Sequence, residues 1–397
     1  MRQLLATVNY CGVLLLVVLL AMSSHPAVTG GSRSSGIENG TFLSPYIIML
    51  FAGIVALSIK SLFRYKVQRC SWMLFFFSVL ASLAAMVFFK NDEMLGDIRA
   101  LGISLCAVAV GCNLDLRRGK NKFLLLFYAL LFTFVGLMII IHGLGGFVIE
   151  AIYVDTAKNT LGVNLAVTIL IFVAFVLDSS VGKGWRLVFL AFTAFSFLII
   201  LTLRARSATL CATMIILYAF YVYNHGKNKR SAIFKTAIVF VLIIILLLLI
   251  PATQDYIFNS FTMGHEDDLL SGRSERNEDA LDFFLNNMFT GNLDRHAKLE
   301  WTHNFPLLKL SEYGALFSLP IMLMYTYQLF FTIRRSLHIK RELLGYLGYI
   351  ALLVPFVCSM AEPSLPYGPG TSSIFSFILF GVALRYDEEN AIVCYCF

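Results

Sequence analysis

The chain has 397 residues, of which 58% are hydrophobic and 14% are charged, and its mean hydropathy is +0.78. Soluble domains are about half apolar and about a quarter charged, so this composition excludes an ordinary soluble protein and indicates a polytopic membrane protein. The net charge of +7 does not indicate a nucleic-acid partner, because the basic residues lie mostly in short loops between apolar runs rather than on one solvated face.

Apolar runs recur along the chain, and each is long enough to cross a bilayer. Lipid offers the backbone no hydrogen-bond partner, so such spans form helices rather than sheet. We therefore predict an all-α fold with about 12 transmembrane helices. The first run could also be a signal peptide, since small residues follow it, but its length favours a retained helix. The predicted spans are 4–22, 44–63, 72–89, 98–114, 123–141, 161–177, 187–203, 207–223, 236–250, 306–333, 344–360 and 371–385.

Basic clusters follow alternate spans, at 64–69, 117–122, 227–230 and 334–341. The positive-inside rule assigns such clusters to the cytoplasm, and with an even number of spans both termini lie there as well.

The longest polar stretch is acidic and falls on the opposite, outer side of the membrane. It divides the chain into a first block of nine helices at 1–251, a large outer loop at 252–305, and a last block of three helices with a cytoplasmic tail at 306–397. The other loops are too short to hold a second domain.

Disulfide, metal and nucleotide sites have little support in the sequence. None of the eight cysteines falls in the large loop, where a disulfide framework would be expected. The run 265–268 and His296 carry ligands that suit a divalent metal, but their spacing fits no standard loop, and Cys394 and Cys396 form only a C-x-C pair in the tail. The chain also lacks the motifs of ATP-driven pumps and standard hydrolases. We expect no metal site.

Arg204 and Arg206 lie between two apolar runs, at an edge that the alternation of loops makes the outer one. A guanidinium at a membrane edge is costly to bury and is often functional, and its planar fork suits a phosphate. The alternative is that both side chains reach lipid headgroups. Arg273 and Arg276 lie in the acidic loop, where an arginine can equally form a surface salt bridge.

The stretch 301–314 reads W-T-H-N-F-P-L-L-K-L-S-E-Y-G, where the large loop re-enters an apolar run. A neutral imidazole is the usual general base near pH 7, so His303 at this edge could deprotonate a hydroxyl; the alternative is an interfacial histidine that hydrogen-bonds loop backbone. Lys309 and Glu312 are polar residues in the following helix, which favours a wet cleft along that face. A simple i,i+3 ion pair is the competing interpretation.

The segment from His303 to Gly314 resembles the hallmark of the bacterial O-antigen polymerase and O-antigen ligase superfamily: His, then Asn, Ser or Gln, nine residues, and then G-x-x-G or G-x-x-T. His303, Asn304 and Gly314 match, whereas Phe317 occupies the last position. Three further features are similar to the family, namely Arg206-Ser207-Ala208 after a mid-chain helix, Gly272-Arg273 in the large loop, and K-N-x-x-G at 158–162.

The resemblance implies a GT-C-like, metal-independent glycosyltransferase without cofactor, in the bacterial inner membrane, with the large loop on the periplasmic side. By residue, Arg206 and Arg273 would hold the pyrophosphate of the donor, although Arg204 could take the place of Arg206. His303 would be the base on the acceptor hydroxyl, and Asn304 would orient His303 or a sugar. The remaining substrate-binding candidates are Arg276, Lys309 and Glu312.

The donor and acceptor implied are glycans on undecaprenyl pyrophosphate, with a chain-length regulator, a flippase and membrane lipids as further partners. An O-antigen polymerase joins two such repeat units, whereas an O-antigen ligase transfers the glycan to lipid A–core. Phe317 and the K-N-x-x-G match favour the polymerase. A lipid-linked glycan transporter without catalysis is a third hypothesis, but the candidate residues gather at one face rather than at mid-membrane.

Overall fold

The structure, a computed structural model, describes residues 2–23, 45–114, 119–144, 157–225, 273–293, 302–337, 343–367 and 373–395. Within these ranges the regular elements are all helical, which confirms the all-α class. In chain order they are α1 (Arg2–Ser23), α3 (Pro45–Ser58), the 3₁₀ turn η1 (Ile59–Ser61), α4 (Lys66–Phe89), α5 (Met94–Gly111), α6 (Gly119–Leu144), α7 (Ala157–Leu177), α8 (Lys183–Thr202), α9 (Arg206–His225), α12 (Arg273–Asn286), α13 (Phe305–Ser336), α14 (Leu343–Cys358) and α15 (Ile374–Tyr395).

Within the described ranges, seven helices are long and apolar enough to cross a membrane: α4, α5, α6, α7, α8, α9 and α13. Shorter apolar helices occupy Asn9–Ser23, Ile48–Ser61 and Leu343–Cys358. Every predicted span that falls on described residues is therefore helical, and this is a polytopic membrane protein. The predicted span 236–250 lies outside the described residues, as do the run 265–268 and His296.

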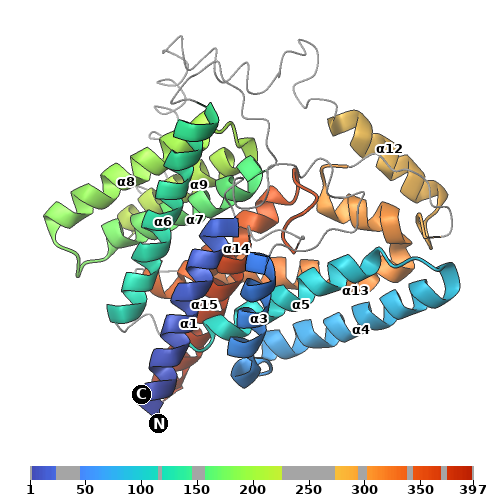
Figure 1. The fold of residues 1–397 in the computed structure, drawn as a ribbon, viewed down its shortest axis with the longest axis horizontal. Helices are drawn as coiled ribbons and strands as arrows, with labels where there is room; N and C mark the ends of the chain where they lie inside the picture. Colours follow the sequence, from blue (N-terminus) through green and yellow to red (C-terminus); the bar gives the residue numbers. More distant parts are fainter. Residues whose placement is uncertain are drawn as a thin grey trace.

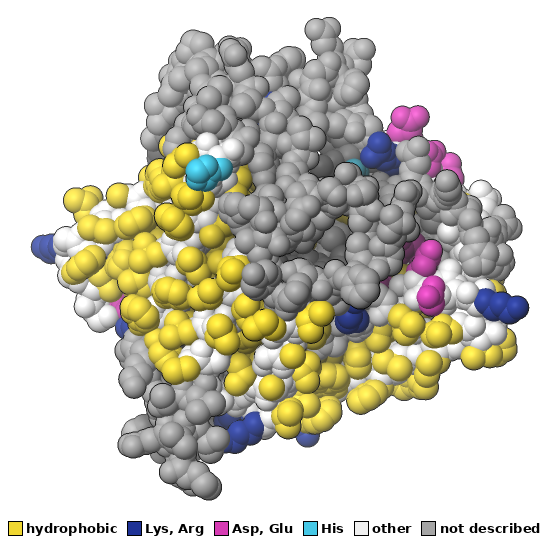
Figure 2. Space-filling model, viewed as in Figure 1, with side chains coloured by type: hydrophobic (Ala, Val, Ile, Leu, Met, Phe, Trp, Pro, Cys, Tyr) yellow, Lys and Arg dark blue, Asp and Glu magenta, His cyan; other side chains and the backbone are white. Residues whose placement is uncertain are grey.

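The helices form a bundle whose centre is filled by α7, α14 and α15 (Figure 1). Of the most apolar window of α7, 83% is buried, whereas only 22% of the window of α4 and 28% of that of α8 are buried. In the bilayer, α4 and α8 therefore present most of their surface to lipid. Figure 2 shows the hydrophobic side chains spread over the helical part of the face that it draws.

Glycines let α15 approach its neighbours closely. A Cβ atom at Gly348 of α14 would lie 1.8 Å from the carbonyl oxygen of Leu379, and one at Gly381 would lie 2.0 Å from that of Val108 in α5. Small residues at helix contacts are how membrane helices gain close van der Waals packing where lipid leaves no hydrophobic drive for association. These contacts fix α5 and α14 on either side of α15.

One end of the bundle is tied by ion pairs between residues from loops and helix ends that the basic-loop bias assigns to the cytoplasm. The first helical residues of α1 and the last of α15 lie toward the same lower end of the view in Figure 1. The ion pairs are Arg64–Glu388 at 3.4 Å, Lys122–Asp178 at 2.9 Å and Arg335–Asp387 at 3.0 Å. The candidate catalytic residues lie at other helix ends.

Candidate functional site

The C-terminal end of α14 is the point where three other helix starts meet. The backbone N–H of Phe305, the first residue of α13, donates to the carbonyl oxygen of Ser359 at 2.9 Å. The amide nitrogen of Asn159 in α7 donates to the carboxylate of Glu362 at 2.6 Å. The starts of α13 and α7, where the His303 segment and the K-N-x-x-G segment lie, are thus both held by the residues that follow α14. Neither Ser359 nor Glu362 belongs to a sequence motif.

The third start belongs to α9. The Sγ atom of Cys211, one and a half turns into α9, lies 3.6 Å from Sγ of Cys358 at the end of α14. Five helical residues span about 7.5 Å along the axis, so Arg206 lies about that far along α9 from this contact. Arg206 and His303 therefore occupy the same end of the bundle, joined through the last turn of α14.

His303 and Asn304 form the entry to α13. Asn304 is the N-cap of the helix: its side-chain oxygen accepts from the backbone N–H of Leu307 at 3.1 Å, and its amide nitrogen lies 3.9 Å from the sulfur of Met360. His303 precedes the cap, is half-buried, and has its Nδ1 atom buried. Asn304 therefore fixes where the helix begins and, with it, the backbone position of His303.

Arg204 and Arg206 flank the turn between α8 and α9. Arg204 has a positive φ of 52°, which non-glycine residues rarely adopt, and both arginines are half-buried. The turn packs on α7, because a Cβ atom at Gly162 would lie 2.8 Å from Cβ of Ala205. Gly162 ends the K-N-x-x-G segment. This glycine lets the turn that carries Arg204 and Arg206, which we name the arginine turn, approach α7 closely.

Arg273 and Arg276 lie in α12, a helix inside the stretch that the sequence indicated only as a loop. Arg276 is half-buried, and Arg273 is the first helical residue. The hydroxyl of Thr302, next to His303, forms a short hydrogen bond with the side-chain oxygen of Asn277. Because Arg276 is adjacent to Asn277 and Arg273 is one turn before it, both lie at the end of α12 that is hydrogen-bonded to Thr302, the residue before His303.

Gly314, the last matching position of the family hallmark, interrupts α13. Its φ of 65° and ψ of 173° lie outside the helical region. The break leaves the backbone N–H groups of Ala315 and Leu316 without partners in the helix, and the carbonyl oxygens of Met288 and Phe289 accept from them at 2.7 and 3.2 Å. The backbone that follows α12 is therefore docked into the break in α13, which places α12 over the entry to that helix.

Lys309 and Glu312 belong to a buried ionic cluster with Asp97 of α5. The ammonium of Lys309 lies 2.7 Å from a carboxylate oxygen of Asp97 and 2.7 Å from one of Glu312. Only 8% of the Lys309 side chain is exposed, and the hydroxyl of Tyr313 donates to Asp97 at 2.8 Å. The i,i+3 ion pair, which the sequence offered as the alternative to a wet cleft, is thus present. The second carboxylate, that of Asp97, could not be inferred from spacing along α13.

The cluster and the capped entry lie on the same helix, and an aromatic side chain connects them. Lys309 lies 5.9 Å from the ring centre of Phe305 and 5.2 Å from that of Tyr313. An ammonium over an aromatic face is stabilised by the ring quadrupole. The ammonium of Lys309 is therefore held by the carboxylates of Asp97 and Glu312 and also lies close to the rings of Phe305 and Tyr313.

A family model described as O-antigen ligase matches residues 187–292, about a quarter of the chain. The matched stretch runs through α8, the arginine turn, α9 and α12, and it ends one residue after Gly291 at the break in α13. It therefore contains all four arginine candidates and stops before His303. A search of curated proteins found no match.

Proposed function

This chain belongs to the superfamily of O-antigen polymerases and O-antigen ligases, and from that premise we propose that it is an O-antigen or related surface-polysaccharide polymerase. It would join repeat units carried on undecaprenyl pyrophosphate at the periplasmic face of the bacterial inner membrane. The observation that carries the proposal is the convergence of the His303 entry, the arginine turn and α12 on one end of the bundle.

In the proposed reaction the acceptor hydroxyl attacks the anomeric carbon of the donor glycan with inversion. The new bond joins the hydroxyl oxygen to that carbon, the bond from carbon to the pyrophosphate oxygen breaks, and its electron pair leaves with the pyrophosphate. The imidazole of His303 takes the hydroxyl proton. His303 stands directly before a capped and hydrogen-bonded helix start, and such fixed placement is what a general base needs.

Arg206 and Arg273 would hold the pyrophosphate, with Arg204 as the alternative to Arg206 and Arg276 as a further contact. Fixed guanidinium groups stabilise the negative charge that develops on a leaving group. Arg206 is anchored by the turn on α7, and α12 is anchored by Asn277 to Thr302. These anchors support phosphate binding at the end of the bundle where the His303 entry lies. Lys309 and Glu312 would contribute by holding α13 in place rather than by direct contact, since their charges are paired.

The large loop, 252–305, would act as a lid over the site, between the helical blocks 1–251 and 306–397. Both termini would lie in the cytoplasm, at the end of the bundle that carries the ion pairs of α15. A flippase would supply the lipid-linked units and a chain-length regulator would set the number joined.

An O-antigen ligase is the second candidate, because the matching family model carries that description. The polymerase is favoured by Phe317, which stands where the hallmark has Gly or Thr. Its ring is buried and meets Phe89 of α4 edge-on, with ring centres 5.5 Å apart. In this chain the position is therefore occupied by an aromatic side chain that packs between helices.

A glycan-transfer assay tests the proposal. The protein, purified in lipid nanodiscs with a chelator present, is given only a lipid-pyrophosphate-linked repeat unit. A ladder of products is expected for a metal-independent polymerase, and the His303→Ala variant should yield none while remaining folded in the nanodisc. A single new band that appears only when lipid A–core is added would make the protein a ligase, and transfer at full rate by His303→Ala would remove the base assignment.

A further inference from the structure

The break in α13 lies at the outer boundary of the hydrocarbon core. Arg334 and Arg335 occupy the last turn of α13, and the basic-loop bias places them at the cytoplasmic surface. A hydrocarbon core about 30 Å thick takes about 20 helical residues to cross. Counting back that number from Arg334 reaches Gly314, so the break falls where the acyl chains end and the headgroups begin.

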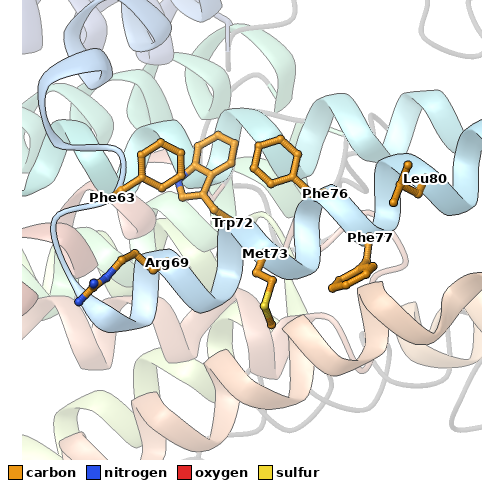
Figure 3. Close-up of a pocket in the computed structure, with 7 residues that line it drawn as sticks. All are labelled: Phe63, Arg69, Trp72, Met73, Phe76, Phe77 and Leu80. Atoms are coloured by element: carbon orange, nitrogen blue, oxygen red, sulfur yellow. The ribbon is translucent and has the colours of Figure 1, made fainter.

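The α4 helix gives the same boundary independently. Arg69 lies near its start, and the exposed rings of Phe76 and Phe77 follow along the helix (Figure 3). The same number of residues counted from Arg69 ends at Phe89, the last residue of α4. The ring of Phe89 meets that of Phe317 with centres 5.5 Å apart. Since Phe317 follows the break in α13 by less than one turn, the two counts agree.

The α12 helix is docked at this level. The carbonyl oxygens of Met288 and Phe289, directly after α12, accept from the backbone N–H groups of Ala315 and Leu316 at 2.7 and 3.2 Å. Ala280, in the middle of α12, is buried and marks the side of the helix that is turned toward the protein. The C-terminal end of α12 is therefore held at the outer boundary of the hydrocarbon core.

An exposed apolar stripe runs along α12 and the turn that follows it. Leu281, Leu285, Met288 and Phe289 are 45%, 54%, 44% and 72% exposed. Their spacing of i, i+4, i+7 and i+8 is the spacing of residues on one face of a helix. Neighbouring large apolar side chains that the protein leaves uncovered mark a surface that meets a partner or a membrane.

Exposed carboxylates lie on another side of α12, at Glu275, Asp279 and Asp282. At 100° per residue, these three lie about 100° to 160° around the helix axis from Leu281. Glu278 is also exposed and precedes the stripe by one turn, so the stripe begins after it. The helix thus has one side against the protein, one apolar side and one acidic side, which is the arrangement of a helix at a membrane surface.

The stripe continues onto the lipid-facing surface of α13. Leu316, whose backbone is hydrogen-bonded to Phe289, is 61% exposed, and Leu319 and Leu323, one and two turns further along, are 52% and 49% exposed. These residues belong to a helix that is long and apolar enough to span the membrane, where acyl chains cover exposed apolar side chains. The lipid that covers Leu316 therefore also reaches Phe289.

We propose that α12 is an interfacial helix, with its stripe inserted into the outer leaflet of the bilayer and its acidic side in water. Such helices bury their apolar side about 5 to 10 Å into the boundary between headgroups and acyl chains, which is the level of the break at Gly314. The partner is the bilayer surface as a whole, and no single lipid is selected. The inference does not depend on the glycosyl-transfer proposal.

Fluorescence quenching of single tryptophans on α12 tests this placement. The three native tryptophans are replaced in a Trp72→Phe/Trp185→Phe/Trp301→Phe protein, and either Leu285→Trp or Leu281→Trp adds a reporter on the stripe. Asp279→Trp, on the acidic side two residues from Leu281, is the matched control. Because it carries the same indole, any intrinsic affinity of tryptophan for the interface would appear there as well. Each protein is reconstituted in phosphatidylcholine vesicles.

The quenchers are phosphatidylcholine brominated either high on the acyl chain or near its end, and acrylamide in the water. The stripe reporters should be quenched about threefold more strongly by the shallow bromines than by the deep ones, and about threefold less by acrylamide than the Asp279→Trp protein, as expected for insertion to interfacial depth.

Equal bromine quenching of the stripe and control reporters would overturn the proposal. So would a stripe reporter that bromine does not quench: strong acrylamide quenching would then place the stripe in water, and weak acrylamide quenching would mean that protein covers it. The two stripe reporters are read separately, so Leu281→Trp decides the matter if Leu285→Trp does not fold.

Discussion

Gly291 and Gly314 meet backbone to backbone at the break in α13. A Cβ atom at Gly291 would lie 2.4 Å from the backbone nitrogen of Gly314, and a Cβ atom at Gly314 would lie 2.3 Å from the carbonyl oxygen of Phe289. Both glycines have positive φ values, 59° and 65°. Gly314, the last hallmark position that this chain matches, is therefore required by geometry, because it lets the segment after α12 dock against α13.

Substitution at this contact should damage the docked segment. We expect Gly314→Ala to destabilise the protein by about 3 kcal/mol, because that backbone region is almost restricted to glycine and the new methyl group meets fixed backbone. Gly96→Ala, in α5 with nothing within 4 Å of the new Cβ, is the control and should change stability little. Thermal unfolding in nanodiscs measures both. Equal melting temperatures for the two variants would mean that the docking is dispensable.

The cluster of Asp97, Lys309 and Glu312 predicts an asymmetric response to charge removal. Lys309→Met leaves two buried carboxylates without their cation and should cost about 3 kcal/mol of stability. Adding Glu312→Gln to Lys309→Met should restore part of that loss, since one uncompensated charge is removed. Thermal unfolding of the single and double variants gives the coupling. If the double variant is less stable than Lys309→Met, the ionic description is wrong.

Asp178 gives the fold an acid-sensitive tie between α6 and the loop after α7. Burial raises the pKa of this carboxyl, but hydrogen bonds from the backbone N–H of Ser180 and from Lys122 outweigh it, so the pKa is lowered overall. A lowered folded-state pKa contributes stability that is present above the unfolded value of about 3.9 and is lost as pH falls through the folded value. Stability should therefore drop in that acid range.

The Asp178→Asn variant isolates this contribution. It should be less stable than the parent at neutral pH and should lose less stability between neutral and acid pH. Asp282→Asn, at an exposed position on α12, should follow the parent curve. Thermal unfolding across the pH range is the measurement, and parallel curves for the parent and Asp178→Asn would contradict the assignment.

The spans could be predicted from the sequence because run length and apolar composition determine them locally. The N-cap at Asn304 and the break at Gly314 lie inside a recognised hallmark, but their backbone roles were not predictable from it. The docking partner at 288–291 is more than twenty residues away in a polar stretch. The α12 helix was missed for a similar reason, because a short polar helix lacks the apolar length that marks a span.

Asp97 and Glu362 show what spacing along one helix leaves out. In the sequence, Asp97 is only one of the acidic residues in the turn 91–97 between two predicted spans, and nothing singles out Glu362. Each gains its role from a partner more than two hundred positions away, Lys309 for Asp97 and Asn159 for Glu362. No periodicity encodes such a pairing, so a single sequence indicates the carboxylates and not their partners.

The arginine turn is where the proposed chemistry can be separated from plain electrostatics. Arg206→Lys keeps the charge at the start of α9 but loses the planar fork that binds two phosphate oxygens at once. We expect at least a tenfold loss of transfer rate, on the order of 1.4 kcal/mol or more of transition-state stabilisation, with thermal stability close to that of the parent. Arg204→Lys is the matched comparison two residues earlier, and the larger loss of the two identifies the phosphate ligand. Rates equal to the parent in both variants would reduce the role of this turn to its positive charge, because a lysine would then serve as well as an arginine.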